Sequence, residues 1–139
     1  MSDTTSELTN EILGAGSVDD VMEEKKEAFA ESTLADYLAQ MLEEHGLSKH
    51  DAIFRSEVDT VYGYQISQGK KKPRRDVLLQ LAFGMSLTVD ETKRLLYYGN
   101  TGTLYPRVKR DAYLMYALHH HYSIAAANRL LYENGEETL

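Results

Sequence analysis

A run of fifteen residues from Asp59 to Pro73 (DTVYGYQISQGKKKP) does most to limit what this chain folds into. Asp59 has the short acceptor side chain that favours a helix start, and Gly69 readily takes the left-handed conformation that ends a helix. The run therefore predicts a short helix from Asp59 to about Gln68, followed by a loop with three consecutive lysines. A short helix beside a basic loop is typical of DNA recognition. The alternative is a solvated surface helix followed by an ordinary lysine loop.

The distribution of charge supports the first interpretation, although the net charge of −7 at first opposes it. Residues 1–51 hold 13 acidic and 3 basic residues, for a charge of −10. Residues 52–75 hold 6 basic and 2 acidic residues, for +4, and residues 76–139 contribute −1. The positive charge therefore lies almost wholly around the predicted helix and its loop.

The composition excludes several classes of protein. At 139 residues with 42% hydrophobic residues, the chain is long enough for one domain with a buried core and an appendage. It has no cysteine, so disulfides, thiolate metal sites and cysteine nucleophiles are excluded. No apolar run approaches the ~20 residues of a membrane span, and the N-terminus lacks the features of a signal peptide. We expect a cytoplasmic protein without a membrane partner.

The first 31 residues are acidic and poor in large apolar side chains, which predicts an arm that is mobile or partly helical. One hypothesis for this arm is that it folds back on the basic loop and mimics DNA.

Caps, stop signals and apolar spacing predict helices on both sides of the central run. Thr88 and Glu91 make a full capping box, whereas Ser48 and Asp51 match the pattern only in part. Gly46 and Gly99 are predicted to end helices. The predicted helices are Leu34–His45, Ser48 (cap) to Ser56, Asp76–Phe83, Thr88 (cap) to Tyr98, Pro106–His120 and Ile124–Asn134, with Pro106 in the first turn of its helix. A tight turn at Glu57 and Val58 joins the second of them to the central helix, which makes a helix-turn-helix.

Four pieces of the sequence resemble the Cro-type phage repressors, the XRE family of helix-turn-helix regulators. They are Gly46-Leu47-Ser48, Gln65-Ile66-x-x-Gly69-Lys70-x-x-Pro73, Asp76-x-Leu78-Leu79-x-Leu81-Ala82 and Leu87-Thr88-Val89-Asp90-Glu91. Each piece is weak alone, but their order and ungapped spacing are specific. The resemblance covers about Leu34 to Tyr98.

The chain departs from the repressor pattern at three places. Ala52-Ile53 stands where the family has Leu-Ala, and Glu57 stands where it usually has Gly. Gly63 occupies a position that usually holds a branched apolar residue, and an interior glycine costs about 1 kcal/mol of helix stability. We expect Phe54 or Tyr62 to fill the gap that Gly63 leaves.

The resemblance implies which residues contact double-stranded DNA. The residues that face base edges are Thr60, Val61, Tyr64 and Gln65, and those that contact phosphates are Ser48, Lys49, Lys70, Lys71, Lys72 and Arg74. The Gln65 amide is suited to adenine, and Val61 to a thymine methyl group. The expected helix carries no Arg or Lys, so much of the affinity is expected to be electrostatic.

The second half of the chain contains an internal repeat. Arg75-Asp76 to Tyr97 aligns without gaps with Arg110-Asp111 to Tyr132, at a shift of 35 residues. This predicts that residues 101–139 form a second helical hairpin, which must pack on something because a lone hairpin cannot bury its apolar face. Its partner is either the rest of the chain or the same hairpin of a second copy. The residues suited to such a homodimer interface are Tyr113, Tyr116, Leu118, Tyr122 and Leu131.

No residue spacing indicates a catalytic site, so we expect no enzyme and no cofactor. Three adjacent histidines, His119 to His121, point in different directions on a helix and are not expected to bind one metal ion.

Together these observations predict an all-α protein: an arm (1–31), a phage-repressor-like five-helix helix-turn-helix domain (32–100) and a C-terminal hairpin (101–139). The predicted function is a sequence-specific transcriptional regulator that inserts helix 59–68 into the major groove. The alternative is a protein–protein interaction module, or an antitoxin-like regulator, that kept the scaffold with weakened DNA recognition.

Overall fold

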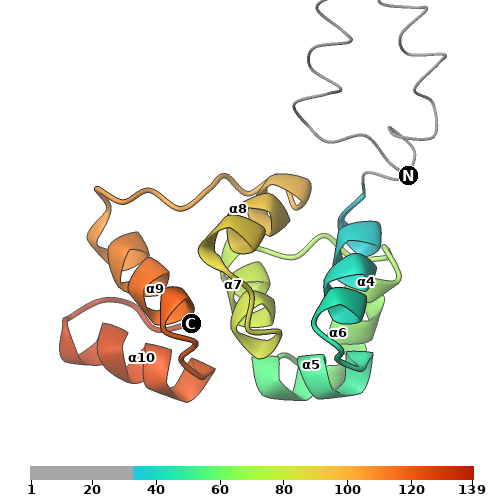
Figure 1. The fold of residues 1–139 in the computed structure, drawn as a ribbon, viewed down its shortest axis with the longest axis horizontal. Coiled ribbons are helices and arrows are strands. Elements are labelled where there is room, and N and C mark those ends of the chain that lie inside the picture. The colour runs from blue at the N-terminus through green and yellow to red at the C-terminus, as the bar shows by residue number, and fades with distance from the viewer. Residues whose placement is uncertain (1–32) are drawn as a thin grey trace, which may run out of the picture. The chain divides into compact units, whose positions relative to one another are not determined.

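The computed structural model describes residues 33–139, of which 34–139 form one compact unit. This part of the chain is all-helical, with seven helices and no strand (Figure 1). The helices are α4 (Leu34–Glu44), α5 (Lys49–Ser56), α6 (Thr60–Ser67), α7 (Arg75–Gly84), α8 (Val89–Tyr98), α9 (Lys109–His119) and α10 (Ile124–Glu133). The hypotheses about an N-terminal arm concern residues 1–31, which lie outside the described residues.

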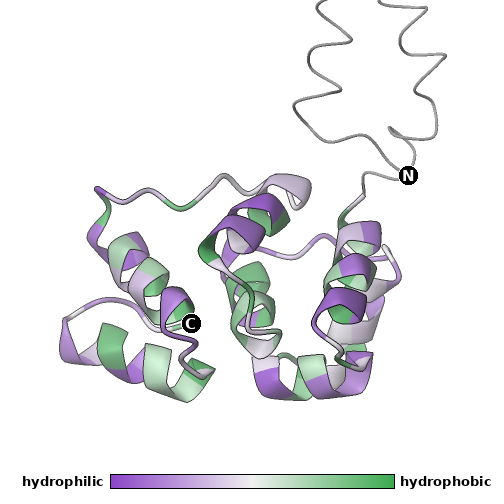
Figure 2. Ribbon diagram, viewed as in Figure 1, coloured by the Kyte–Doolittle hydropathy of each residue, from purple (hydrophilic) through white to green (hydrophobic). Residues whose placement is uncertain are grey.

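Helix α7 is the centre of the core. It packs against α5, α8 and α10, and six of its ten residues are buried. Leu78, Leu79 and Ala82 are completely inaccessible to solvent. A helix that is apolar on most sides is stable only when other helices surround it. Figure 2 shows the same pattern, with hydrophobic positions on α7 and polar positions on the outer faces of α4 and α5.

Gly84 allows α5 and α7 to approach closely. A Cβ atom at this position would lie 1.9 Å from the Ser56 Oγ and 2.7 Å from the carbonyl oxygen of Ala52. The Ser56 hydroxyl is buried and donates a hydrogen bond to that same carbonyl, at 2.5 Å. Only glycine fits between the two helices here.

Three helices begin where their predicted capping residues place them, and Ser123 caps α10 in the same way. The side chains of Ser48, Asp59, Thr88 and Ser123 each accept a hydrogen bond from the backbone N–H three residues on, at 3.0–3.2 Å. The capping box of Thr88 and Glu91 is complete, because the Glu91 carboxylate also accepts from the Thr88 N–H. These starts depend on local chemistry and are confirmed.

The predicted helix ends are correct, and Gly99 ends α8 as its C-cap, although it does so without a left-handed conformation. Gly46 and Gly69 take positive φ angles of 64° and 77°, as predicted. Gly99 does not: its φ is −78°, and Asn100 takes the left-handed conformation instead, with φ of 55°. Gly99 has a packing role, because a Cβ atom there would lie 2.3 Å from the Leu78 Cδ1.

The prediction that Pro106 lies in the first turn of a helix is wrong. Helix α9 begins three residues later, at Lys109. The preceding loop is fixed by tertiary contacts: Leu104 is buried, and the Tyr105 N–H donates to the Asp111 carboxylate at 2.9 Å. These contacts set the path of the chain up to the helix start.

Two crossed ion pairs join α7 to the start of α9. The Arg75 guanidinium donates to both Asp111 oxygens, at 3.1 and 2.8 Å. The Arg110 guanidinium donates to both Asp76 oxygens, each at 2.9 Å. Arg75 and Arg110 are 35 residues apart, as are Asp76 and Asp111, so each Arg-Asp pair of neighbours binds the other reciprocally, as in a two-fold interface.

The helix pair α9–α10 buries much of its apolar face within the same chain. Leu118 and Leu131 are almost inaccessible to solvent, so they are not free to contact a second copy as the homodimer hypothesis required. Tyr113 and Tyr122 are half-buried, and Tyr116 is 52% exposed. The physical reason is that α9 packs on α8 and α10 packs on α7.

Candidate nucleic-acid interface

Helices α5 and α6 are joined by a turn of three residues, 57–59. Glu57 takes the left-handed conformation, with φ of 55° and ψ of 28°, and its N–H donates to the Phe54 carbonyl oxygen at 3.2 Å. A residue with a Cβ atom is disfavoured there by about 1–2 kcal/mol. The turn thus keeps a geometry that favours glycine, although the sequence supplies glutamate.

Helix α6 has a buried face and an open face. Gly63 and Ile66 are buried against the core, and Tyr62 is half-buried. On the other side Thr60 is exposed, and Val61 is 65% exposed. Tyr64 and Gln65 are half-buried. The four predicted base-contacting residues therefore lie together along the open side of one short helix.

The space beside Gly63 is filled by a residue that we did not predict. A Cβ atom on Gly63 would lie 2.8 Å from Ile53 Cγ2, so Ile53 occupies the room that a side chain would need. Phe54 does not fill it, since Phe54 is 77% exposed, and Tyr62 is only half-buried. Two departures from the repressor pattern therefore compensate: a larger residue at 53 accompanies the smaller one at 63, which conserves volume.

The loop after α6 presents its cations to solvent. Lys70, Lys71, Lys72 and Arg74 are all exposed, while Pro73 between them is buried and fixes the loop to the core. Within residues 33–139, none of these four cations pairs with a carboxylate. Their positive charge is therefore not neutralised by the described part of the chain.

The start of α5 adds two further donors. Lys49 is exposed in the first turn. The oxygen of the exposed Ser48 hydroxyl accepts from the Asp51 N–H at 3.1 Å, which leaves its own O–H as a donor. All ten predicted contact residues thus lie at the N-cap of α5, on α5, on α6 or in the loop after α6.

Arg75 does not belong to this positive surface. Its guanidinium is bound to Asp111, whose side chain is 4% exposed, and it also donates to the Thr103 carbonyl oxygen at 2.6 Å. The charge count of residues 52–75 included Arg75 among its six basic residues, although Arg75 was not a predicted phosphate contact. The signal that could have corrected this is the repeated Arg-Asp pair, although only tertiary structure shows that the two copies bind each other.

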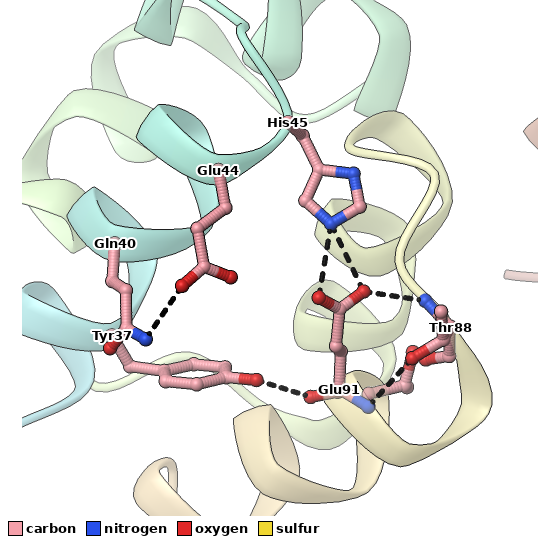
Figure 3. A network of polar contacts seen from close by, with 7 residues as sticks. Tyr37, Gln40, Glu44, His45, Thr88 and Glu91 are labelled. Atoms are coloured by element: carbon pink, nitrogen blue, oxygen red, sulfur yellow. Dashed lines mark hydrogen bonds and ion pairs between the residues drawn. The ribbon is translucent and has the colours of Figure 1, made fainter.

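A second polar network braces α4 against α8 (Figure 3). The His45 Nε2 lies 3.0 and 3.2 Å from the two Glu91 carboxylate oxygens. The Tyr37 hydroxyl donates to the Glu91 backbone carbonyl at 3.1 Å. Burial, together with the charge of Glu91, raises the pKa of Tyr37 to about 12, so this hydroxyl stays protonated. The capping-box pattern predicted the role of Glu91 at the start of α8, but it did not predict the contacts of Glu91 with Tyr37 and His45.

A groove of about 780 Å³ lies beside the start of α6 and was not predicted. One wall is the α5–α6 turn, and the other is formed by the end of α7 and the α9–α10 turn, including Tyr122 and Ser123. No local pattern could have found it, because its walls come from segments more than 60 residues apart in the chain.

Residues 33–139 contain no group of three or more potential metal-ligating side chains and no helix that could cross a bilayer. Comparison with protein families, with curated proteins and with solved structures found no match for this chain.

Proposed function

We propose that the protein binds double-stranded DNA through α6 and acts as a sequence-specific transcriptional regulator. The observation that carries this proposal is the open face of α6, which is flanked by cations that no carboxylate of residues 33–139 neutralises. Two eight-residue helices joined by a three-residue turn make a compact unit in which the second helix fits a major groove about 12 Å wide.

In this proposal, the bases are contacted by side chains of α6. The half-buried Gln65 makes no hydrogen bond through its amide within the described residues, so its donor and acceptor are free for the N6 and N7 of adenine. The exposed Val61 suits a thymine methyl group, and Thr60 offers a hydroxyl. Tyr64, which is half-buried, is suited to a phosphate or sugar beside the bases.

The proposed contacts with the DNA backbone come from residues at both ends of the α5–α6 pair. Ser48 and Lys49 precede or begin α5, and Lys70 to Lys72 with Arg74 follow α6. Such contacts orient a protein on DNA without reading sequence. Because α6 has no Arg or Lys of its own, these flanking cations supply most of the affinity.

Selection of bound fragments from random duplex DNA tests the proposal. We expect a consensus to emerge, and Gln65→Ala should flatten the preference at one base pair, a loss of about 1–3 kcal/mol of discrimination. Gln40→Ala on α4 is the matched control and should leave the consensus unchanged. The absence of any enriched sequence would remove the regulator proposal and favour the interaction module as the function.

A further inference from the structure

The groove beside the α5–α6 turn has the size of a ligand-binding site. Its volume of about 780 Å³ falls within the range of roughly 300–1,000 Å³ that is common for small-molecule pockets. Its walls are held together by rigid contacts, because α7 packs tightly on α5 at Gly84, and the crossed ion pairs fix α9 to α7. The groove is therefore a built feature of the fold.

The lining of the groove combines aromatic surface with negative charge. Phe54 lines it and is 77% exposed, so its ring is accessible to a ligand in the groove. Tyr122 and the buried Phe83 add further aromatic surface. Glu57 and Asp59 also line it, and neither forms an ion pair within residues 33–139.

We infer that this groove binds an organic cation with an apolar body, such as a quaternary ammonium compound. Aromatic faces attract such a cation, and the two carboxylates complement its charge. Arg55 and His121 are the basic side chains of the lining; with His121 neutral, one guanidinium against the two carboxylates leaves a negative balance. An anion of the same shape is repelled, and a neutral molecule leaves the carboxylates partly desolvated without compensation.

The groove is connected to the start of α6. Glu57 holds the left-handed turn, and the Asp59 carboxylate caps α6 by accepting from the Tyr62 N–H at 3.0 Å. A ligand that contacts these side chains and the α9–α10 turn together fixes the position of α6 relative to the C-terminal helices. The consequence for DNA affinity rests on the proposed function, whereas the binding of the cation does not.

Three probes of one shape test the inference. Benzyltrimethylammonium is the cation, benzyl methyl sulfone the neutral counterpart and benzylsulfonate the anion. Each is titrated into the full chain to about 50 mM and followed by amide NMR shifts, a range that detects millimolar Kd values. We expect shifts at Glu57 to Thr60 and His121 to Ala125, with the cation binding about fivefold more tightly than the sulfone and the anion most weakly.

Variants assign the contacts without disturbing the core. Phe54→Ala should weaken the cation about fivefold, since its ring is exposed and not part of the core. Glu57→Gln should remove most of the preference for the cation over the sulfone. Tyr132→Ala, equally exposed at the end of α10, and Glu43→Gln on α4 are the controls and should change nothing.

Equal affinity for the cation and the sulfone, shifts outside the groove, or no shift at the highest concentration would each overturn the inference. Because this titration contains no DNA, its outcome is independent of the proposed function. If the cation binds, the DNA affinity is measured with and without it, and an unchanged affinity would remove the link to α6 while leaving the site.

Discussion

The helix pairs α7–α8 and α9–α10 carry the same local signals 35 residues apart, yet they play different parts. Each pair turns at a left-handed residue, Ser86 with φ of 53° and His121 with φ of 54°, and each second helix has a hydroxyl cap. The difference lies in what covers them. On α7, Leu81 is 4% exposed, whereas its counterpart Tyr116 on α9 is 52% exposed. Similar local signals thus give similar helices, whereas burial of each helix depends on the helices packed around it and on differences such as that between Leu81 and Tyr116.

The largest loss of stability is expected when the more buried aspartate of the two crossed ion pairs is replaced. The side chain of Asp111 is 4% exposed and that of Asp76 is 37% exposed. Asp111→Ala leaves the Arg75 guanidinium and the Tyr105 N–H without this acceptor and should cost about 3–5 kcal/mol of unfolding free energy. Asp76→Ala should cost less, about 1 kcal/mol, because the Asp76 carboxylate is 37% exposed and the Arg110 guanidinium keeps the Glu137 carbonyl oxygen as an acceptor. Urea unfolding measures both, and equal losses would mean that burial does not distinguish the two pairs.

The next largest loss of stability is expected on replacing Gly84 with alanine, compared with the same change at its counterpart in the repeat, the exposed His119. Gly84→Ala places a Cβ atom 1.9 Å from the Ser56 Oγ and 2.7 Å from backbone atoms of α5. We expect a loss of about 2–3 kcal/mol from overpacking. His119→Ala should change stability by less than about 0.5 kcal/mol. Thermal unfolding of the two variants would contradict this comparison if Gly84→Ala were neutral.

Glu91 gives a pH-dependent difference, since its counterpart in the repeat is Ala126. Burial opposes ionisation of Glu91, but hydrogen bonds from the Thr88 N–H and from His45 outweigh it and lower the pKa below the usual 4.5. A lowered pKa stabilises the folded state above the unfolded-state pKa, and this stability is lost as the pH falls through the folded-state pKa.

Glu91→Gln should therefore be less stable than the parent by about 1 kcal/mol at pH 7. The difference should shrink as the pH falls below 4.5, toward and below the folded-state pKa. Denaturation measured from pH 7 to pH 3 checks this, and a difference that grew toward low pH would have the wrong sign.

The smallest change in stability is expected at the two left-handed turn residues, and it tests whether their backbone strain is the same. Ser86 and His121 hold nearly the same strained backbone conformation. Replacing either one with glycine should therefore stabilise the protein by a similar amount, about 0.5–1 kcal/mol. Unequal changes, measured under identical conditions, would show that the side chains rather than the backbone dominate at these turns.

The same contrast explains what could be predicted from the sequence. Helix starts depend on caps such as Thr88 and Ser123, which act within one turn, and apart from α9 every helix end lies within one residue of its predicted position. Contacts between distant segments were missed, because no local pattern encodes them. Ile53 against Gly63, Arg75 against Asp111 and the groove beside Glu57 all belong to this class. The predicted contact residues do lie together, because α6 and the lysine loop are contiguous in the chain.

The most direct test of the account is the salt dependence of DNA binding. The parent protein, the triple variant Lys70→Ala, Lys71→Ala, Lys72→Ala and the control Lys109→Ala are compared across a salt series. Lys109 is exposed at the start of α9, on the far side of α7 and α8 from α6 (Figure 1). We expect the slope of log affinity against log salt to become shallower by about 2–3 in the triple variant and to stay unchanged in the control. A triple variant with the slope of the parent would contradict the proposed interface.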